Sequence, residues 1–164
     1  MKRLMCGVAF LLIGCGPDYQ RGPVFPIELS VTAGLNDQLS VFQVSLVTRG
    51  TSLDCVTVQK ACVKDQVDAT RFAKIKDSMG KEVTSVAFPL SLVAGTPTTQ
   101  DLTLNGLPTG KDYALVIEAL SKDSTPKLVG SSCNYIKELT VGTNAAVFAK
   151  IEVLTPPANC DPRR

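Results

Sequence analysis

The stretch DLTLNGLPTGKDYALVIEAL, residues 101–120, holds two alternating apolar segments on either side of a turn. Leu102 and Leu104 alternate with polar residues before the turn, and Leu115, Ile117 and Ala119 share one face after it. Successive side chains of a β-strand point to opposite faces, so both segments are predicted to be strands with one buried face. Pro108 fixes φ early in the turn, and Gly110 can take the positive φ that reverses the chain.

The same period of two recurs along the rest of the chain at regular spacing. The apolar positions that alternate in this way are Ile27, Leu29 and Val31; Phe42, Val44 and Leu46; Val86, Phe88, Leu90 and Leu92; and Val147, Ala149, Ile151 and Val153. Short alternating strands separated by turn residues predict an all-β sandwich or barrel.

Residues 55–82 lack this clear alternation. One interpretation is a loop closed by Cys55 and Cys62, followed by a hairpin with Gly80 in its turn. The composition of residues 57–75 also allows a short helix, so both interpretations stay open.

Residues 102–120 resemble the turn between the fifth and sixth strands of fibronectin type III domains, and also the prealbumin-like sandwiches of bacterial surface proteins. The resemblance implies a tyrosine corner, in which the Tyr113 hydroxyl returns to the turn backbone beside Pro108 and Gly110. The chain lacks tryptophan, and the sequence after residue 120 predicts two or three strands where a fibronectin domain would have one. We therefore expect an immunoglobulin-like or prealbumin-like Greek-key β-sandwich of about 7–9 strands, stapled by disulfides.

The N-terminus has the layout of an export signal. Lys2 and Arg3 precede an apolar run over residues 4–13, which is shorter than the roughly 20 residues that cross a bilayer. Leu12-Ile13-Gly14-Cys15 resembles the lipobox of bacterial lipoproteins, with an ordinary signal peptide as the alternative. The resemblance implies cleavage after residue 14 and a lipid, palmitate among its acyl groups, on Cys15. In enterobacterial members of that family, an Asp directly after the cysteine favours inner-membrane retention. Gly16 here favours the outer membrane.

Three parts of the chain follow from these boundaries: a cleaved signal at 1–14, a lipidated tether rich in Pro and Gly at 15–26, and one sandwich domain at 27–164. Lys2 and Arg3 account for two of the 17 basic residues, which leaves 15 basic and 15 acidic residues in the mature chain. A neutral, dispersed charge set gives no reason to expect a nucleic-acid partner, since such partners attract a basic patch.

Four cysteines remain in the predicted domain: Cys55, Cys62, Cys133 and Cys160. An even number in an exported chain predicts two disulfides, and a zinc site is disfavoured because the chain has no histidine and no Cys-x-x-Cys. We expect Cys55–Cys62 from their short separation. We expect Cys133–Cys160 from a hairpin in which residues 135–141 and 146–154 pair as neighbours. A pairing that joins Cys55 or Cys62 to another sheet is the alternative.

The sequence offers little catalytic chemistry. Without histidine, a Ser-His-Asp or Cys-His arrangement is ruled out. Glu118 stands out in an apolar strand, where an outward-facing position is the simplest explanation. Asp65 and Asp68 are expected on a solvated face. Asp101, Asn105 and Asp112 flank the 102–113 turn, where calcium binding and plain turn chemistry are both open. No metal or other cofactor is therefore predicted.

These observations favour a lipid-anchored envelope protein that is not an enzyme and that uses a sandwich surface for binding or adhesion. Its expected partners are the membrane, through Cys15, and an envelope protein or glycan. A structural accessory subunit of an envelope complex is the second hypothesis, and an enzyme that uses carboxylates alone is the third.

Overall fold

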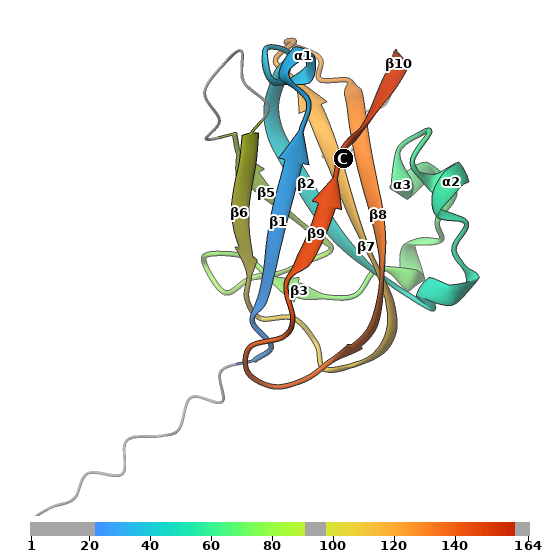
Figure 1. Cartoon of the computed structure of the whole chain (residues 1–164). Coiled ribbons are helices and arrows are strands. Elements are labelled where there is room, and N and C mark those ends of the chain that lie inside the picture. The colour runs from blue at the N-terminus through green and yellow to red at the C-terminus, as the bar shows by residue number, and fades with distance from the viewer. Residues whose placement is uncertain (1–21, 91–97, 160–164) are drawn as a thin grey trace, which may run out of the picture.

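The computed structural model describes residues 22–90 and 98–159, which form two β-sheets packed face to face (Figure 1). One sheet has three strands in the order β6–β1–β9, and the other has five in the order β10–β8–β7–β2–β5. The strands are β1 Phe25–Val31, β2 Leu39–Thr48, β5 Ser85–Pro89, β6 Thr98–Leu104, β7 Gly110–Ser121, β8 Leu128–Leu139, β9 Val147–Lys150 and β10 Glu152–Ala158. The predicted all-β sandwich is confirmed.

The main core lies between the two sheets and is built from the alternating positions. Every buried side chain of β1 points into it, and the predicted faces of β2 and β7 are correct. The largest fully buried side chains of this core include Ile27, Leu29, Phe42, Leu46, Leu115 and Ile117. Alternation fixes a strand's face because a slip of one residue would turn the whole apolar set to solvent.

β7 is the central strand of the larger sheet, and it is buried on both faces from Ala114 to Ser121. It pairs antiparallel with β2 on one side and with β8 on the other. Its inner residues enter the main core, whereas Ala114 and Val116 on the opposite face pack in a separate apolar cluster. A second layer therefore covers the outer face of this sheet.

The expected hairpin of residues 135–141 and 146–154 is wrong. Residues 147–150 form β9, which pairs parallel with β1 in the smaller sheet, and β10 alone returns to β8. Ile151 marks the crossing between the sheets and is buried against Gly130, where a Cβ would come 2.8 Å from the Ile151 Cγ2 atom. Because the chain changes sheets at this point, Val153 is about half exposed instead of buried.

Residues 50–83 contain the short helix that the composition allowed and the expected hairpin, but Cys55 and Cys62 do not close a loop between them. They form short helical turns and a small hairpin: η1 Gly50–Ser52, α2 Cys55–Val58, α3 Val63–Gln66, η2 Ala69–Arg71, β3 Ile75–Lys76 and β4 Glu82–Val83. The hairpin pairs Ile75 with Val83, and Gly80 takes a positive φ in its turn. A further short helix, α1 Ala33–Asn36, connects β1 to β2.

The folded body begins before Ile27, the first residue of the predicted domain. β1 starts at Phe25, and the Val24 N–H donates to the Gly142 carbonyl at 2.8 Å. Several predicted features lie outside the described residues: the expected signal, the expected lipidation site Cys15, Leu92 and Cys160. Within residues 22–90 and 98–159, no helix is long and apolar enough to cross a membrane.

Candidate functional site

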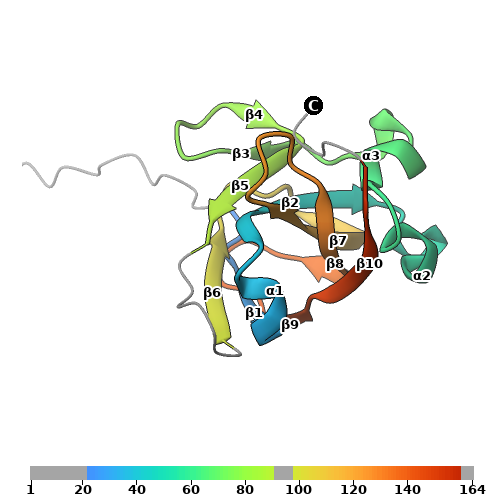
Figure 2. The same cartoon turned by 90° about the horizontal axis from the view of Figure 1, so that it is seen from above.

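Residues 53–72, here called the cap, lie over the outer face of the five-stranded sheet, on the side away from the three-stranded sheet (Figures 1 and 2). Val58, Val63 and Val67 of the cap pack on Val47 of β2 and on Ala114 and Val116 of β7. The cap's last residue, Phe72, forms a β-bridge to Val47. A second, smaller apolar cluster thus forms between two strands and a cap that has no regular strands of its own.

A disulfide between Cys55 and Cys133 joins the cap to β8. Cys133 is in register with Val116 on the outer face, so its side chain meets the cap there. The expected pairing of Cys55 with Cys62 and of Cys133 with Cys160 is therefore wrong. The expectation failed because it rested on short sequence separation and on a hairpin that does not form, whereas the observed bridge spans 78 residues.

Cys62 is fully buried and is also disulfide-bonded. Its partner is not among the described residues, since Cys55 and Cys133 bond to each other. Cys62 directly precedes α3, so both Cys55 and Cys62 belong to the cap.

Polar side chains form a row beneath the cap on the outer face of the sheet. Gln43 of β2, Glu118 of β7 and Ser131 of β8 are cross-strand neighbours. The Gln43 Nε2 donates to the Ser85 Oγ at 2.9 Å, and the Ser131 Oγ donates to the Gln59 carbonyl at 2.8 Å. All three members of the row are buried, because the cap covers a face that would otherwise meet solvent.

Glu118 is the charged member of this row, with only 1% of its surface exposed. Its Oε1 accepts a hydrogen bond from the Val63 N–H at 2.9 Å. The predicted outward orientation of Glu118 matches the face on which it lies, but the cap removes it from solvent. A strand pattern reports the face of a residue and cannot show what packs on that face.

Burial raises the pKa of the Glu118 carboxyl to about 7, because the charged form loses hydration. The Val63 N–H and the positive charge of Lys64 oppose this rise in the pKa, while Asp65 adds to it. Glu118 therefore changes its charge close to neutral pH, as few surface carboxylates do.

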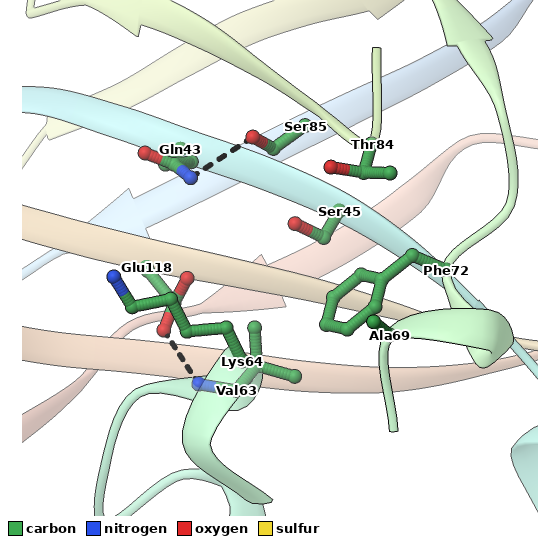
Figure 3. A pocket seen from close by; sticks show the side chains of 9 residues that line it. All are labelled: Gln43, Ser45, Val63, Lys64, Ala69, Phe72, Thr84, Ser85 and Glu118. Carbon is green, nitrogen blue, oxygen red and sulfur yellow. Dashed lines mark hydrogen bonds between the residues drawn. The ribbon is translucent and has the colours of Figure 1, made fainter. Parts of the chain in front are cut away.

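A cavity of about 180 Å³ lies between the cap and the sheet, beside Glu118 (Figure 3). Its lining is mixed: an amide, three hydroxyls, one carboxylate, one lysine and an aromatic ring. The residues are Gln43, Ser45, Val63, Lys64, Ala69, Phe72, Thr84, Ser85 and Glu118. An apolar wall combined with a few convergent polar groups is typical of small-molecule sites.

Phe72 and Ser85 are held at the cavity by the backbone around them. β5 begins at Ser85, which is in register with Ser45. Beyond that point, the Ala73 N–H donates to the Leu46 carbonyl at 2.8 Å, and Arg71 donates to the Thr48 and Arg49 carbonyls. The end of the cap thus follows the edge of β2 beyond Ser85, the first residue of β5, and this brings Phe72 to the cavity.

The predicted structural corner lies on the opposite face of β7 from Glu118. The Tyr113 hydroxyl donates to the Thr109 carbonyl at 3.3 Å, directly after Pro108. Gly110 has φ of 151°, and a Cβ on it would come 2.5 Å from the Tyr113 hydroxyl. Burial raises the pKa of Tyr113. These residues shape the turn, and Tyr113 packs in the main core.

The remaining acidic candidates do not converge. The Asp112 carboxylate accepts hydrogen bonds from the Thr51 N–H at 2.8 Å and from its hydroxyl at 3.2 Å. Asp65 and Asp68 are exposed, and Asp68 accepts from the Thr70 N–H and hydroxyl, which hold the pKa of its carboxyl below its usual range. Among the residues that the structure describes, no three His, Cys, Asp or Glu side chains come together as metal ligands, so Asp101 and Asp112 belong to no such group.

Sequence reasoning singled out Glu118 but missed its partners. Gln43 and Ser45 occupy the outward positions of a strand whose apolar positions were predicted, so their shared face could have been inferred. Nothing local predicts that Phe72, in a segment without periodicity, reaches the same place.

Comparisons of the chain with protein-family models, with curated proteins and with solved structures find no match.

Proposed function

We propose that this protein is a lipid-anchored envelope protein, placed in the outer membrane, whose capped outer face binds a small polar ligand. The observation that carries the binding proposal is the cavity in which the buried Glu118 meets an amide, three hydroxyls and an aromatic ring. The lipobox-like Leu12–Cys15 carries the anchoring proposal.

The mixed lining supports binding to a ligand with one polar end and one apolar end. Buried polar groups cost free energy unless they are hydrogen-bonded, so a ligand that pairs with them is recognised specifically. Gln43 and Glu118 lie on neighbouring strands of a sheet, which holds the floor of the cavity rigid.

The lining supports binding better than catalysis. Acid–base chemistry with carboxylates alone needs two that converge, and Glu118 is the one carboxylate among the nine residues described around the cavity. We therefore propose a non-catalytic role, with a component of the envelope as the source of the ligand.

Saturation-transfer NMR tests the binding proposal directly. The full-length protein would be screened against a panel of small amines, alcohols, amides and carboxylates, in parallel with an Ala69→Phe variant that fills the cavity. Ala69 is exposed and lines the cavity, so the larger side chain should block it without disturbing the main core. Ala158→Phe, on β10 outside the lining, is the matched control.

A compound that binds the wild type and the control, but not Ala69→Phe, would support the proposal. Binding that survives Ala69→Phe, or an absence of any binder in the panel, would contradict it.

The anchor is tested separately by metabolic labelling with palmitate in a bacterial host. Cys15→Ser should abolish the label and leave the signal uncut, because the cysteine is the lipid acceptor in the family that the segment resembles. Unchanged labelling of the variant would show that the lipobox interpretation is wrong.

A further inference from the structure

β6 is an outer strand of the three-stranded sheet, and its free edge lacks the usual protection. Native proteins blunt strand edges with proline, lysine, bulges or short length, because unpaired backbone groups can pair with another chain. Among the described outer strands, β10 contains Pro156 and Pro157, and β5 contains Pro89. β9 has only 4 residues and includes Lys150. β6 has 7 residues, no proline, no lysine and an unbroken register with β1.

The backbone of β6 presents hydrogen-bonding groups at this edge. The Ile151 N–H donates to the Ser30 carbonyl at 3.0 Å, so Ser30 directs its backbone groups to β9, and the neighbouring positions of β1 direct theirs to β6. Leu102 therefore lies in a hydrogen-bonded pair with β1. The N–H and C=O groups of Asp101 and Thr103 point the other way, where no described strand pairs with them.

β5 presents its own free edge on the same side of the sandwich. The Leu90 N–H donates to the Ser40 carbonyl at 3.2 Å, so Ala87, three positions earlier, directs its backbone groups away from β2. β5 and β6 lie side by side in both views (Figures 1 and 2). The Gln100 Nε2 donates to the Pro89 carbonyl at 3.1 Å and joins the two edges at one end.

A groove of about 460 Å³ lies between these strands and shares only Ser85 with the cavity under the cap. Its apolar wall comes from both sheets, with Val86 and Phe88 of β5 and Leu104 of β6. Val86 and Phe88 pack on the main core but are only partly buried. Apolar side chains placed in the groove would therefore extend the main core.

The outward side of the β6 edge is acidic. Asp101 lies directly opposite Glu28, and both side chains are exposed. Like charges directly opposite each other destabilise a strand pair. Neither carboxylate forms an ion pair with another described residue, and Lys150 on β9 pairs with Glu152 at 3.2 Å. A cationic side chain beside Asp101 is therefore favoured.

We infer that the groove between β5 and β6 binds an extended segment of another protein, which adds a fourth strand to the sheet at β6. The alternate apolar side chains of this segment enter the groove toward Val86 and Phe88, and a basic residue between them lies beside Asp101. In strand addition, main-chain hydrogen bonds give affinity and pockets for alternate side chains give specificity. This site goes beyond the proposed function and does not depend on the cavity under the cap.

Two other occupants fit this edge less well. Two copies of β6 paired around Asp101 would bring two acidic Asp101–Glu28 pairs together, and like charges repel. A free anion finds no net positive charge in the groove, because Lys76 and Asp77 both line its end at the β3–β4 hairpin.

The test is hydrogen exchange of the ¹⁵N-labelled full-length protein, measured by NMR, with a short extended peptide as the probe. In this peptide, four valines alternate with a threonine, a central lysine and a second threonine. The Asp101 and Thr103 amides should exchange more than about tenfold more slowly when the peptide is present, because they become hydrogen-bonded. The Leu102 amide, which already faces β1, is the internal control and should change little.

Two altered peptides separate the backbone from the charge. N-methylation of the central lysine removes the N–H that faces β6 and should weaken binding by more than about tenfold, whereas N-methylation of a neighbouring valine should cost less. Replacing the lysine with glutamate should also weaken binding by more than about tenfold.

Variants of the protein test the same two features. Thr103→Pro removes an N–H from the free edge, where proline is tolerated, and should weaken binding by more than about tenfold. Protection of the Leu102 amide shows whether this variant stays folded. Asp101→Asn should reduce the preference for the lysine peptide over the glutamate peptide several-fold. Glu138→Gln, at an exposed position of β8, is the matched control and should keep the full preference.

Protection of Asp101 and Thr103 that needs the lysine and its N–H would support the inference. Absence of protection, equal binding of the lysine and glutamate peptides, or unchanged binding to a folded Thr103→Pro variant would overturn it. Slow exchange of these amides without any peptide would overturn it too, because the chain itself would then cover the edge. Protection that rises with protein concentration alone would identify a second copy as the occupant and also overturn it.

Discussion

The molecule buries apolar side chains in two places, on the two faces of the same five-stranded sheet. The inner face packs against the three-stranded sheet through strand residues such as Phe42 and Ile117. The outer face packs against the cap through a smaller cluster, in which Val63 and Val67 lie outside any strand. The first region is held by sheet-on-sheet packing, whereas the second depends on short helical turns and a disulfide.

The two regions also differ in polarity. The inner faces of β2 and β7 contribute apolar side chains, while their outer faces bury Gln43, Ser45 and Glu118. Buried polar groups lower stability unless they are paired. The comparison teaches that stability is concentrated between the sheets and that the polar chemistry is kept under the cap.

Adjacent residues of β7 test this division most strongly. Ile117→Ala removes a fully buried side chain from the inner core and should cost about 2–5 kcal/mol of unfolding free energy. Val116→Ala, one residue away on the outer face, should cost about 1–3 kcal/mol, since it leaves a smaller cavity in a looser layer. Urea midpoints measure both. Equal losses would show that the two regions contribute alike.

Breaking the bridge should affect the cap region first. The double variant Cys55→Ser, Cys133→Ser opens a link that spans 78 residues and should cost about 2–4 kcal/mol. Limited proteolysis should then cut within residues 53–72 before it cuts the strands, with the oxidised wild type as control. Cleavage elsewhere first would contradict the view that this bridge holds the cap.

Non-reducing peptide mapping of the wild type checks the bridge itself. It should recover a Cys55–Cys133 peptide. We expect Cys160 as the partner of the disulfide-bonded Cys62, because Cys6 and Cys15 belong to the expected signal and lipid site. A peptide joining Cys55 to Cys62 would rule out this arrangement.

The pH dependence of stability sharpens the contrast in polarity. The pKa of Glu118 is raised from 4.5 to about 7 on folding, so the folded state binds the proton more tightly. The contribution of Glu118 to the free energy of unfolding is fully present below about pH 4.5 and is lost as the pH rises through 7. Glu118→Gln should be close to the wild type in stability at pH 4.5 and more stable by about 1–3 kcal/mol at pH 8.5. Thermal or urea unfolding across pH measures this, with Glu28→Gln as control; a constant difference would contradict the raised pKa.

The smallest effect is expected at the turn that precedes β7. Tyr113→Phe removes the hydrogen bond to the Thr109 carbonyl but keeps the ring in the inner core, so it should cost about 1 kcal/mol. The urea midpoint measures it. A loss as large as that of Ile117→Ala would mean that the hydroxyl does more than close the turn.

The sequence by itself determined the strand faces and the turn before β7. Leu29, Phe42 and Ile117 are buried where alternation places them, because strand geometry makes the face of a residue a local property. The positive φ of Gly110 could also be predicted, since the conformation of a turn depends on a few neighbouring residues.

Only the tertiary structure decided the disulfide partner of Cys133, the change of sheet at Ile151 and the burial of Glu118. The disulfide partner of Cys133 and the burial of Glu118 depend on the cap, and the change of sheet at Ile151 depends on β1 and β8. Contacts of this kind are chosen by which surfaces remain to be covered once the strands have paired. Neither alternation nor residue spacing contains that information. The candidate site could therefore not be predicted from the sequence, because it exists only where the cap covers the sheet.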